Sequence, residues 1–124
     1  MLTDQEAIAT IAVKNLEAAK KFYEGTLGLK RTPSSEEGVQ GYKSGNASVL
    51  VYESQYAGTN KATTATWEVK DLEGVVRELK GKGVHFEHYD FPGAKRTGDI
   101  HETGRTKAAW FKDPDGNILA LVSG

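Results

Sequence analysis

The stretch Val13–Glu17 reads VKNLE, and it returns as VKDLE at Val69–Glu73. Each copy follows a short run of β-forming residues and opens a helical pattern, which ends at glycine before another β-like run. Self-similarity at a fixed separation is the signature of an internal repeat. The sequence therefore predicts a pseudo-symmetric fold built from two copies of one supersecondary unit, with a ligand site where the halves meet.

Length and composition restrict the class of protein. A chain of 124 residues fits a single domain, residues 1–124, that is large enough to bury a core. Lysine and arginine number 16 against 17 acidic residues, which gives no electrostatic footprint for nucleic acid or an anionic membrane. The absence of cysteine excludes disulfides and thiolate metal sites. Because no apolar run approaches the roughly 20 residues of a membrane span and Met1–Glu6 lacks a signal-peptide pattern, we expect a cytoplasmic protein.

The first module is expected over about residues 7–54. Asn15 is the predicted helix N-cap, and an apolar stripe at helical spacing follows it. Gly45-Asn46 is a hairpin turn between two strands, and Pro33–Gly38 is a polar turn. The predicted strands are Ile8–Val13, Leu29–Thr32, Gln40–Ser44 and Ala47–Glu53.

The second module is expected over about residues 63–124, with Asp71 as the helix N-cap. Asp113–Gly116 is a tight turn, because proline presets φ, aspartate caps its own backbone and glycine takes positive φ. Phe91–Arg105 is long, polar and glycine-bearing, which is typical of a lid or a mobile loop. The predicted strands are Thr64–Val69, Val84–Asp90, Thr106–Lys112 and Asn117–Val122.

Three features point to one family: the repeated helix start, Phe22-Tyr23 followed by Leu27–Leu29, and Phe111–Asn117 near the end of the chain. Together they resemble the vicinal oxygen chelate superfamily, which includes glyoxalase I, bleomycin-resistance proteins and extradiol dioxygenases. The resemblance implies an α+β fold in which two βαβββ modules form an open, barrel-like cup. Many members dimerise, so a homodimer that completes or shields the cups is expected.

Strand periodicity sorts the residues of such a fold by face. Apolar residues that cover the helices set one phase: Ala9, Ile11, Val13, Val49, Val51, Ala65, Trp67, Val69, Val84, Phe86, Leu119 and Leu121. The opposite phase is predicted to face the cup: Ile8, Thr10, Ala12, Ser48, Leu50, Tyr52, Thr64, Thr66, Glu68, His85, Glu87, Tyr89, Ala108, Trp110, Ile118, Ala120 and Val122.

The resemblance also implies where a divalent metal would be held in catalytic members. Those places correspond to Ile8, Leu50, Thr64 and Ala120, with Tyr52 as a competitor for the second of them. None of the four carries the imidazole or carboxylate that such metals prefer. We therefore expect no metal and no cofactor. A displaced metal site would have to use His85, Glu87 and His101.

These observations favour a metal-independent small-molecule binding protein of the drug-sequestering or sensing kind, similar to bleomycin-resistance proteins. Aromatic surface with a few polar groups is typical of such a site, and the ligand is expected to be aromatic or cationic. The predicted ligand contacts are Tyr52, Glu68, His85, Tyr89 and Trp110. The alternative is a metal-dependent lyase or dioxygenase-like enzyme with the displaced site, so enzymatic activity stays open. A third hypothesis is a structural or regulatory module with a vestigial cup.

Overall fold

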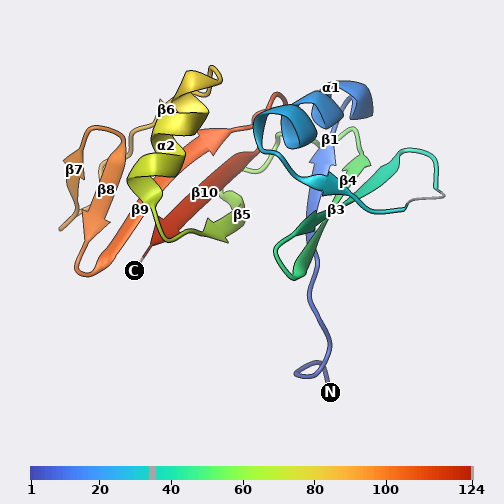
Figure 1. Cartoon of the computed structure of the whole chain (residues 1–124), viewed down its shortest axis with the longest axis horizontal. Helices are drawn as coiled ribbons and strands as arrows, with labels where there is room; N and C mark the ends of the chain where they lie inside the picture. The colour runs from blue at the N-terminus through green and yellow to red at the C-terminus, as the bar shows by residue number, and fades with distance from the viewer. Residues whose placement is uncertain (34–35, 124) are drawn as a thin grey trace.

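The computed structural model describes residues 1–33 and 36–123, and its first half forms a four-stranded sheet with helical cover (Figure 1). The strand order is β1-β4-β3-β2, in which β1 and β4 are parallel and the other pairs antiparallel. The elements are β1 (Ala9–Val13), α1 (Leu16–Lys20), the π-helix η1 (Lys21–Thr26), β2 (Lys30–Arg31), β3 (Val39–Ser44) and β4 (Ala47–Glu53). The turn expected over Pro33–Gly38 includes residues 34 and 35, which lie outside the described residues.

The second half repeats this order and adds a hairpin. Its sheet has the order β5-β10-β9-β8-β7, and β6 pairs with β9 beside β8. The elements are β5 (Thr63–Glu68), α2 (Leu72–Gly81), β6 (Phe86–Glu87), β7 (Lys95–Thr97), β8 (Ile100–Thr103), β9 (Thr106–Lys112) and β10 (Ile118–Ser123). The α+β fold of two βαβββ modules is confirmed.

The repeated sequence start is a helix cap in both modules, as predicted. The Asn15 side chain accepts a hydrogen bond from the backbone N–H of Ala18 at 3.1 Å. Asp71 accepts one from the backbone N–H of Gly74 at 3.0 Å. Each cap satisfies a backbone donor that has no partner within its helix, which fixes where the helix begins.

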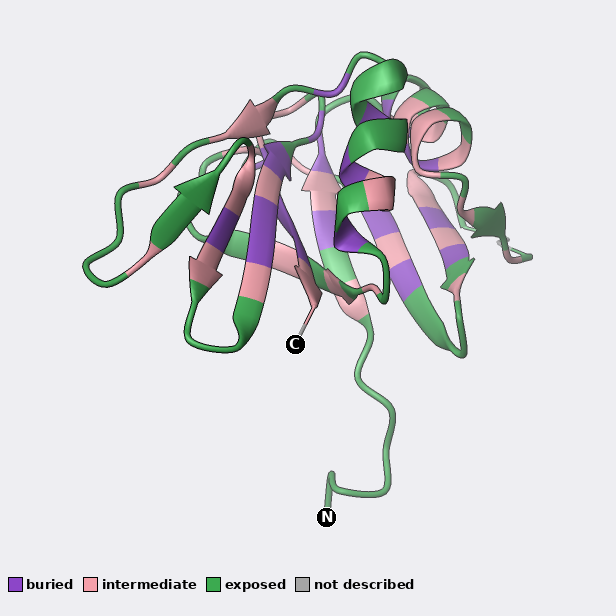
Figure 2. Cartoon of the chain, turned by 60° about the vertical axis from the view of Figure 1, so that its left-hand side comes forward, coloured by how far each residue is buried: buried purple, intermediate pink, exposed green. Residues whose placement is uncertain are grey.

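The two helical segments lie on the same side of the two sheets, and one apolar core fills the space between (Figures 1 and 2). All the residues predicted to cover the helices belong to this core or pack against it. Figure 2 shows the resulting bands of buried and less buried residues along the strands. The opposite faces of both sheets form what we call the concave side, which carries the phase predicted for the cup.

The sheets do not close into a barrel within one chain. β1 and β5 are neighbours, but no described strand of one sheet pairs with a strand of the other. The cup expected between the modules is therefore open in the single chain, and its two walls lie side by side.

The turn after β9 ties the two modules together. Asp113 Oδ1 accepts hydrogen bonds from the backbone N–H groups of Asp115 and Asn117, and Gly116 has φ +90°, as the turn chemistry predicts. Asn117 Nδ2 also donates to the carbonyl of Ala12 in β1 at 2.7 Å. The Tyr23 hydroxyl donates to Asp113 Oδ2 at 2.7 Å. One turn thus joins β1, η1 and the β9–β10 connection.

The expectation of a long loop over Phe91–Arg105 was wrong. Most of this segment is the β7–β8 hairpin, which extends the second sheet beside β9. The turn between β7 and β8 and the turn between β8 and β9 each have two residues and begin with a glycine at positive φ, Gly98 at +63° and Gly104 at +59°. Only the residues before β7 are irregular. The strand predicted at Val84–Asp90 is correspondingly shorter, because only Phe86 and Glu87 pair with β9.

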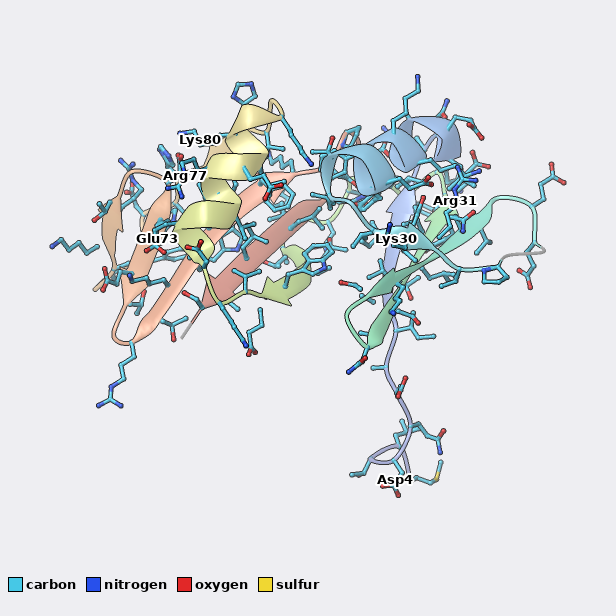
Figure 3. The ribbon with its side chains drawn as sticks, viewed as in Figure 1. Asp4, Lys30, Arg31, Glu73, Arg77 and Lys80 are labelled. Atoms are coloured by element: carbon cyan, nitrogen blue, oxygen red, sulfur yellow. The ribbon has the colours of Figure 1, made fainter. Side chains whose placement is uncertain are left out.

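Ion pairs fasten α2 to the second sheet and its added hairpin. Glu73, Arg77 and Lys80 lie along one side of α2 (Figure 3). Lys80 Nζ lies 2.7 Å from Asp99 Oδ2 at the hairpin tip, and Lys107 in β9 pairs with Glu73 at 3.2 Å.

Among the described residues no helix has the length and apolar character needed to cross a bilayer. The cytoplasmic location stays a prediction.

Candidate functional site

The concave side of the first sheet contains an open hollow of about 590 Å³. Tyr52, 36% exposed, stands at this hollow on β4, and Thr10 lies on the adjacent strand β1. The lining mixes apolar and polar groups, which suits a small organic molecule. It consists of Thr10, Thr32, Pro33, Glu36, Val39, Gly41, Leu50 and Tyr52.

The concave side of the second sheet carries four packed rings, Tyr89, Phe91, His101 and Trp110, here called the aromatic cluster. The His101 and Trp110 centroids are 5.0 Å apart at an interplanar angle of 80°, and Tyr89 and Trp110 are 5.5 Å apart at 79°. Phe91 lies 5.4 Å from Trp110 and 5.9 Å from His101. These edge-to-face contacts are favourable arrangements for aromatic rings.

Strand register explains how the rings meet. His101 on β8 pairs with Ala108 on β9, and Trp110 lies two residues further along β9 on the same face. The chain after β6 brings Tyr89 alongside, where its backbone N–H donates to His101 Nε2 at 2.9 Å. A register shift in the β5–β10 pairing leaves Thr64 unpaired, and Trp110 Nε1 donates to the Thr63 hydroxyl at 3.2 Å.

Two polar atoms of the aromatic cluster are buried without a hydrogen-bond partner in the part of the chain that the structure describes. They are the Tyr89 hydroxyl and His101 Nδ1. His101 is only 2% exposed. Burial, and next the nearby Glu87 carboxylate, raises the pKa of Tyr89, so its hydroxyl keeps its proton at neutral pH.

The donor chemistry does not fit the metal site of catalytic family members. At the corresponding positions Ile8 is exposed, Leu50 and Thr64 are half-buried, and Ala120 is buried in β10. None of these side chains offers a nitrogen or a carboxylate oxygen.

The displaced metal site is not assembled either. His85 is exposed, Glu87 pairs with Lys112 at 3.6 Å, and His101 Nε2 is occupied by the Tyr89 N–H. Within residues 1–33 and 36–123 no group of three or more His, Asp or Glu side chains could hold a metal ion.

The structure brings together two of the five predicted ligand contacts. Tyr89 and Trp110 share the aromatic cluster, whereas Tyr52 stands at the hollow of the first sheet. Glu68 is exposed at the end of β5, and His85 lies beside a separate depression near Lys112.

Two members of the aromatic cluster, Phe91 and His101, were predicted to lie on a lid, whereas both belong to this site. The two-residue turns Gly98-Asp99 and Gly104-Arg105 were the signal for their true place, because they predict strands that carry His101 next to β9.

A smaller cavity of about 270 Å³ lies on the helix side, between the end of η1 and α2. Trp67 is in its wall, where its Nε1 donates to the Ser44 hydroxyl at 2.9 Å. This agrees with the prediction that Trp67 lies under a helix rather than in the cup.

Fold and site together define a tandem βαβββ protein with an open, aromatic-bearing concave side. A model of the Glyoxalase/Bleomycin resistance protein/Dioxygenase superfamily matches residues 7–121, and the chain belongs to this superfamily. No match was found among curated protein sequences.

Solved structures with low sequence identity share the fold. FosX, a fosfomycin resistance protein from Listeria monocytogenes complexed with Mn(II), has a TM-score of 0.73 at 16% identity, covering 100% of this chain and 92% of that chain. A lactoylglutathione lyase from Agrobacterium tumefaciens has a TM-score of 0.72 at 15% identity, with 98% and 94% covered. TnmS3, an antibiotic binding protein from Streptomyces sp. CB03234, has a TM-score of 0.70 at 21% identity, with 99% and 98% covered.

Proposed function

We propose that this protein binds a small organic molecule on its concave side without a metal ion, as a drug-sequestering or sensing protein of the bleomycin-resistance kind. The observation that carries the proposal is the aromatic cluster, whose rings gather on the face opposite the core. Aromatic surface beside a few polar groups binds flat ligands by stacking and dispersion.

The donor chemistry supports the metal-independent part of the proposal. Ile8, Leu50, Thr64 and Ala120 replace the ligating side chains that the family reactions require. Chemistry that depends on a metal to polarise a substrate would have no protein ligands at those positions. The antibiotic binding protein among the structural relatives shows that this fold can serve binding, and we extend that role to this chain.

We further propose that two copies associate so that the concave sides are covered. Tyr52 lies on this side, Ile8 just before β1 is 54% exposed, and the sheets of one chain leave the cup open. A second copy would bury these apolar groups and would enclose a ligand more completely than one sheet can.

The first test is the metal content of the untagged protein, followed by calorimetric titration of Zn²⁺, Ni²⁺, Mn²⁺ and Fe²⁺. We expect substoichiometric metal and no heat of binding. Stoichiometric metal with sub-micromolar affinity would overturn the proposal and would direct attention to His85, Glu87 and His101.

The second test is a thermal-shift screen of planar aromatic and cationic antibiotics, bleomycin included, in the presence of EDTA. We expect at least one compound to raise the melting temperature, and Trp110→Ala to weaken its binding about tenfold or more because a stacking surface is lost. The matched control is Tyr56→Ala, since Tyr56 is 69% exposed on the linker between the modules. Binding that disappears in EDTA would contradict the proposal.

A further inference from the structure

His101 occupies an unusual position for a polar side chain. It is 2% exposed and surrounded by the rings of Tyr89, Phe91 and Trp110, yet its Nδ1 has no partner among the described residues. The ring of Tyr89 lies 6.2 Å from that of His101, and its hydroxyl is also buried and unpaired within that part of the chain. A buried polar atom without a partner costs about 1–3 kcal/mol, so native proteins rarely keep two of them together without a use.

The hydrogen bond that His101 makes determines which of its ring nitrogens is a donor. His101 Nε2 faces the backbone N–H of Tyr89 at 2.9 Å, so this ring nitrogen must be the acceptor. A neutral imidazole then carries its proton on Nδ1, which makes Nδ1 a donor. The raised pKa of Tyr89 keeps its hydroxyl protonated, and that hydroxyl can also donate. Both atoms therefore require an acceptor.

The surroundings restrict the shape and the charge of that acceptor. Phe91 is 44% exposed on the irregular segment between β6 and β7, so an incoming ring can take its place against Trp110. Glu87 and Lys112, the two charged groups that act on the Tyr89 hydroxyl, pair with each other at 3.6 Å and leave little net charge beside it. A flat molecule with a polarised oxygen fits this environment without needing a formal charge.

We propose that the concave side of the second sheet recognises a planar aromatic molecule bearing an acceptor oxygen, a ketone or a phenol-type oxygen, with His101 Nδ1–H and the Tyr89 hydroxyl as the donors. This inference rests on the proposed small-molecule function and names the class of its ligand. His101 and Phe91 thereby become specificity-determining residues in addition to Tyr89 and Trp110.

The test compares 9-fluorenone with fluorene, two planar molecules that differ only in the presence of a ketone oxygen. Binding is followed by the fluorescence of Trp110 in a Trp67→Phe background, because the chain has only these 2 tryptophans. We expect fluorenone to bind about tenfold more tightly, the ratio that one satisfied buried hydrogen bond of about 1.4 kcal/mol supplies.

Two variants separate recognition from structure. His101→Gln keeps an acceptor for the Tyr89 N–H but has no N–H at the position of Nδ1, because its amide nitrogen lies further along the side chain, so the preference for fluorenone should fall toward unity. Tyr89→Phe removes only the hydroxyl, and it should reduce the preference while leaving the melting temperature of the free protein unchanged or higher. If His101→Gln fails to fold, Tyr89→Phe alone decides the question.

Equal affinity for both probes would overturn this inference and leave the proposed binding function intact. Failure of both probes to bind would also overturn it, whereas the antibiotic screen in EDTA judges the binding function separately. A loss of stability in Tyr89→Phe with an unchanged preference would show that the hydroxyl has a structural role only.

Discussion

At the scale of single residues, Asp113 holds the junction between the modules. Its carboxylate is buried and receives hydrogen bonds from the Tyr23 hydroxyl, from the Asn117 side chain and from two backbone N–H groups of its own turn. A buried carboxylate is tolerated only when its lone pairs are satisfied in this way. The stability of the junction therefore depends on each of these donors.

Tyr23→Phe removes one donor and leaves the Asp113 carboxylate partly unsatisfied. We expect the free energy of unfolding to fall by about 1–3 kcal/mol, because a hydrogen bond to a buried charged group is lost. Urea denaturation measures the change. Tyr56→Phe, at a tyrosine that is 69% exposed, is the control and should have no effect. An unchanged midpoint in Tyr23→Phe would contradict the role assigned to this contact.

The same contact predicts a dependence on pH. Burial, and next the Asp113 carboxylate, raises the pKa of Tyr23 well above its ordinary value of 10.0. A group whose pKa is raised by folding stabilises the native state below its unfolded pKa and loses that contribution as the pH rises further. The stability difference between the native chain and Tyr23→Phe should therefore be constant up to about pH 10 and narrow above it.

Gly58, on the linker between the modules, is a position where a side chain would be strongly destabilising. Its φ is +73°, and a Cβ at this position would overlap the carbonyl oxygen of Asp115. We expect Gly58→Ala to lower the free energy of unfolding by about 2 kcal/mol or more, because backbone strain adds to the overlap. The control is Gly81→Ala, which has open space for a Cβ and should be neutral or slightly stabilising. A stable Gly58→Ala variant would show that the linker can move away from the Asp113 turn.

At the scale of elements, the sequence predicts the repeated parts well. The helix caps at Asn15 and Asp71 and the hairpin turn at Gly45-Asn46 follow from local chemistry, and each is present. The β7–β8 hairpin escaped prediction because Lys95–Thr97 is short and entirely polar, so it shows no alternation of apolar residues. Pairing with a neighbouring strand decides its conformation, and that information is not local.

The hairpin tip is held by Asp99, which lies between Lys80 of α2 and His88, 2.7 Å from each. Hydrogen bonds from Lys80 first and His88 second lower the pKa of Asp99 below its ordinary value of 3.8. Its stabilising contribution is therefore present above that value and is lost as the pH falls below it.

Asp99→Asn should release the tip and lower the free energy of unfolding by about 0.5–1.5 kcal/mol, a modest amount because the side chains of Lys80 and His88 are about half exposed to solvent. Hydrogen exchange of the β7 and β8 amides should accelerate more than exchange in β10. Asp4→Asn, on the exposed N-terminal segment (Figure 3), is the control. Uniform acceleration across the second sheet would show that the tip does not open independently.

At the scale of the whole molecule, strand alternation predicted the core correctly, because every residue of the apolar phase belongs to the core or packs against it, but it could not assemble the site. Tyr89 and Trp110 meet because of the β6–β9 register, whereas Tyr52 lies in the other sheet and Glu68 at an open edge. Which residues of one phase actually touch depends on how strands pair and on how the two sheets are placed, and neither is encoded in spacing along the chain.

The proposed association of two copies is tested by sedimentation velocity. We expect the mass of a dimer, and we expect Leu50→Arg to shift the distribution toward monomer, because a charge on the concave side must be desolvated in the interface. The matched control is Arg77→Glu, since Arg77 lies on α2, on the other side of the sheet from the concave side (Figure 3). A native chain that sediments as a monomer at all concentrations would contradict the proposed dimer.

The alternation along β9 has an evolutionary consequence. Ala109 and Phe111 are buried in the core, and Trp110 between them faces the concave side. Substitutions at every second position of β9 can therefore change the concave face without disturbing the core. A backbone with this separation lets the concave face vary by single substitutions while the core stays the same.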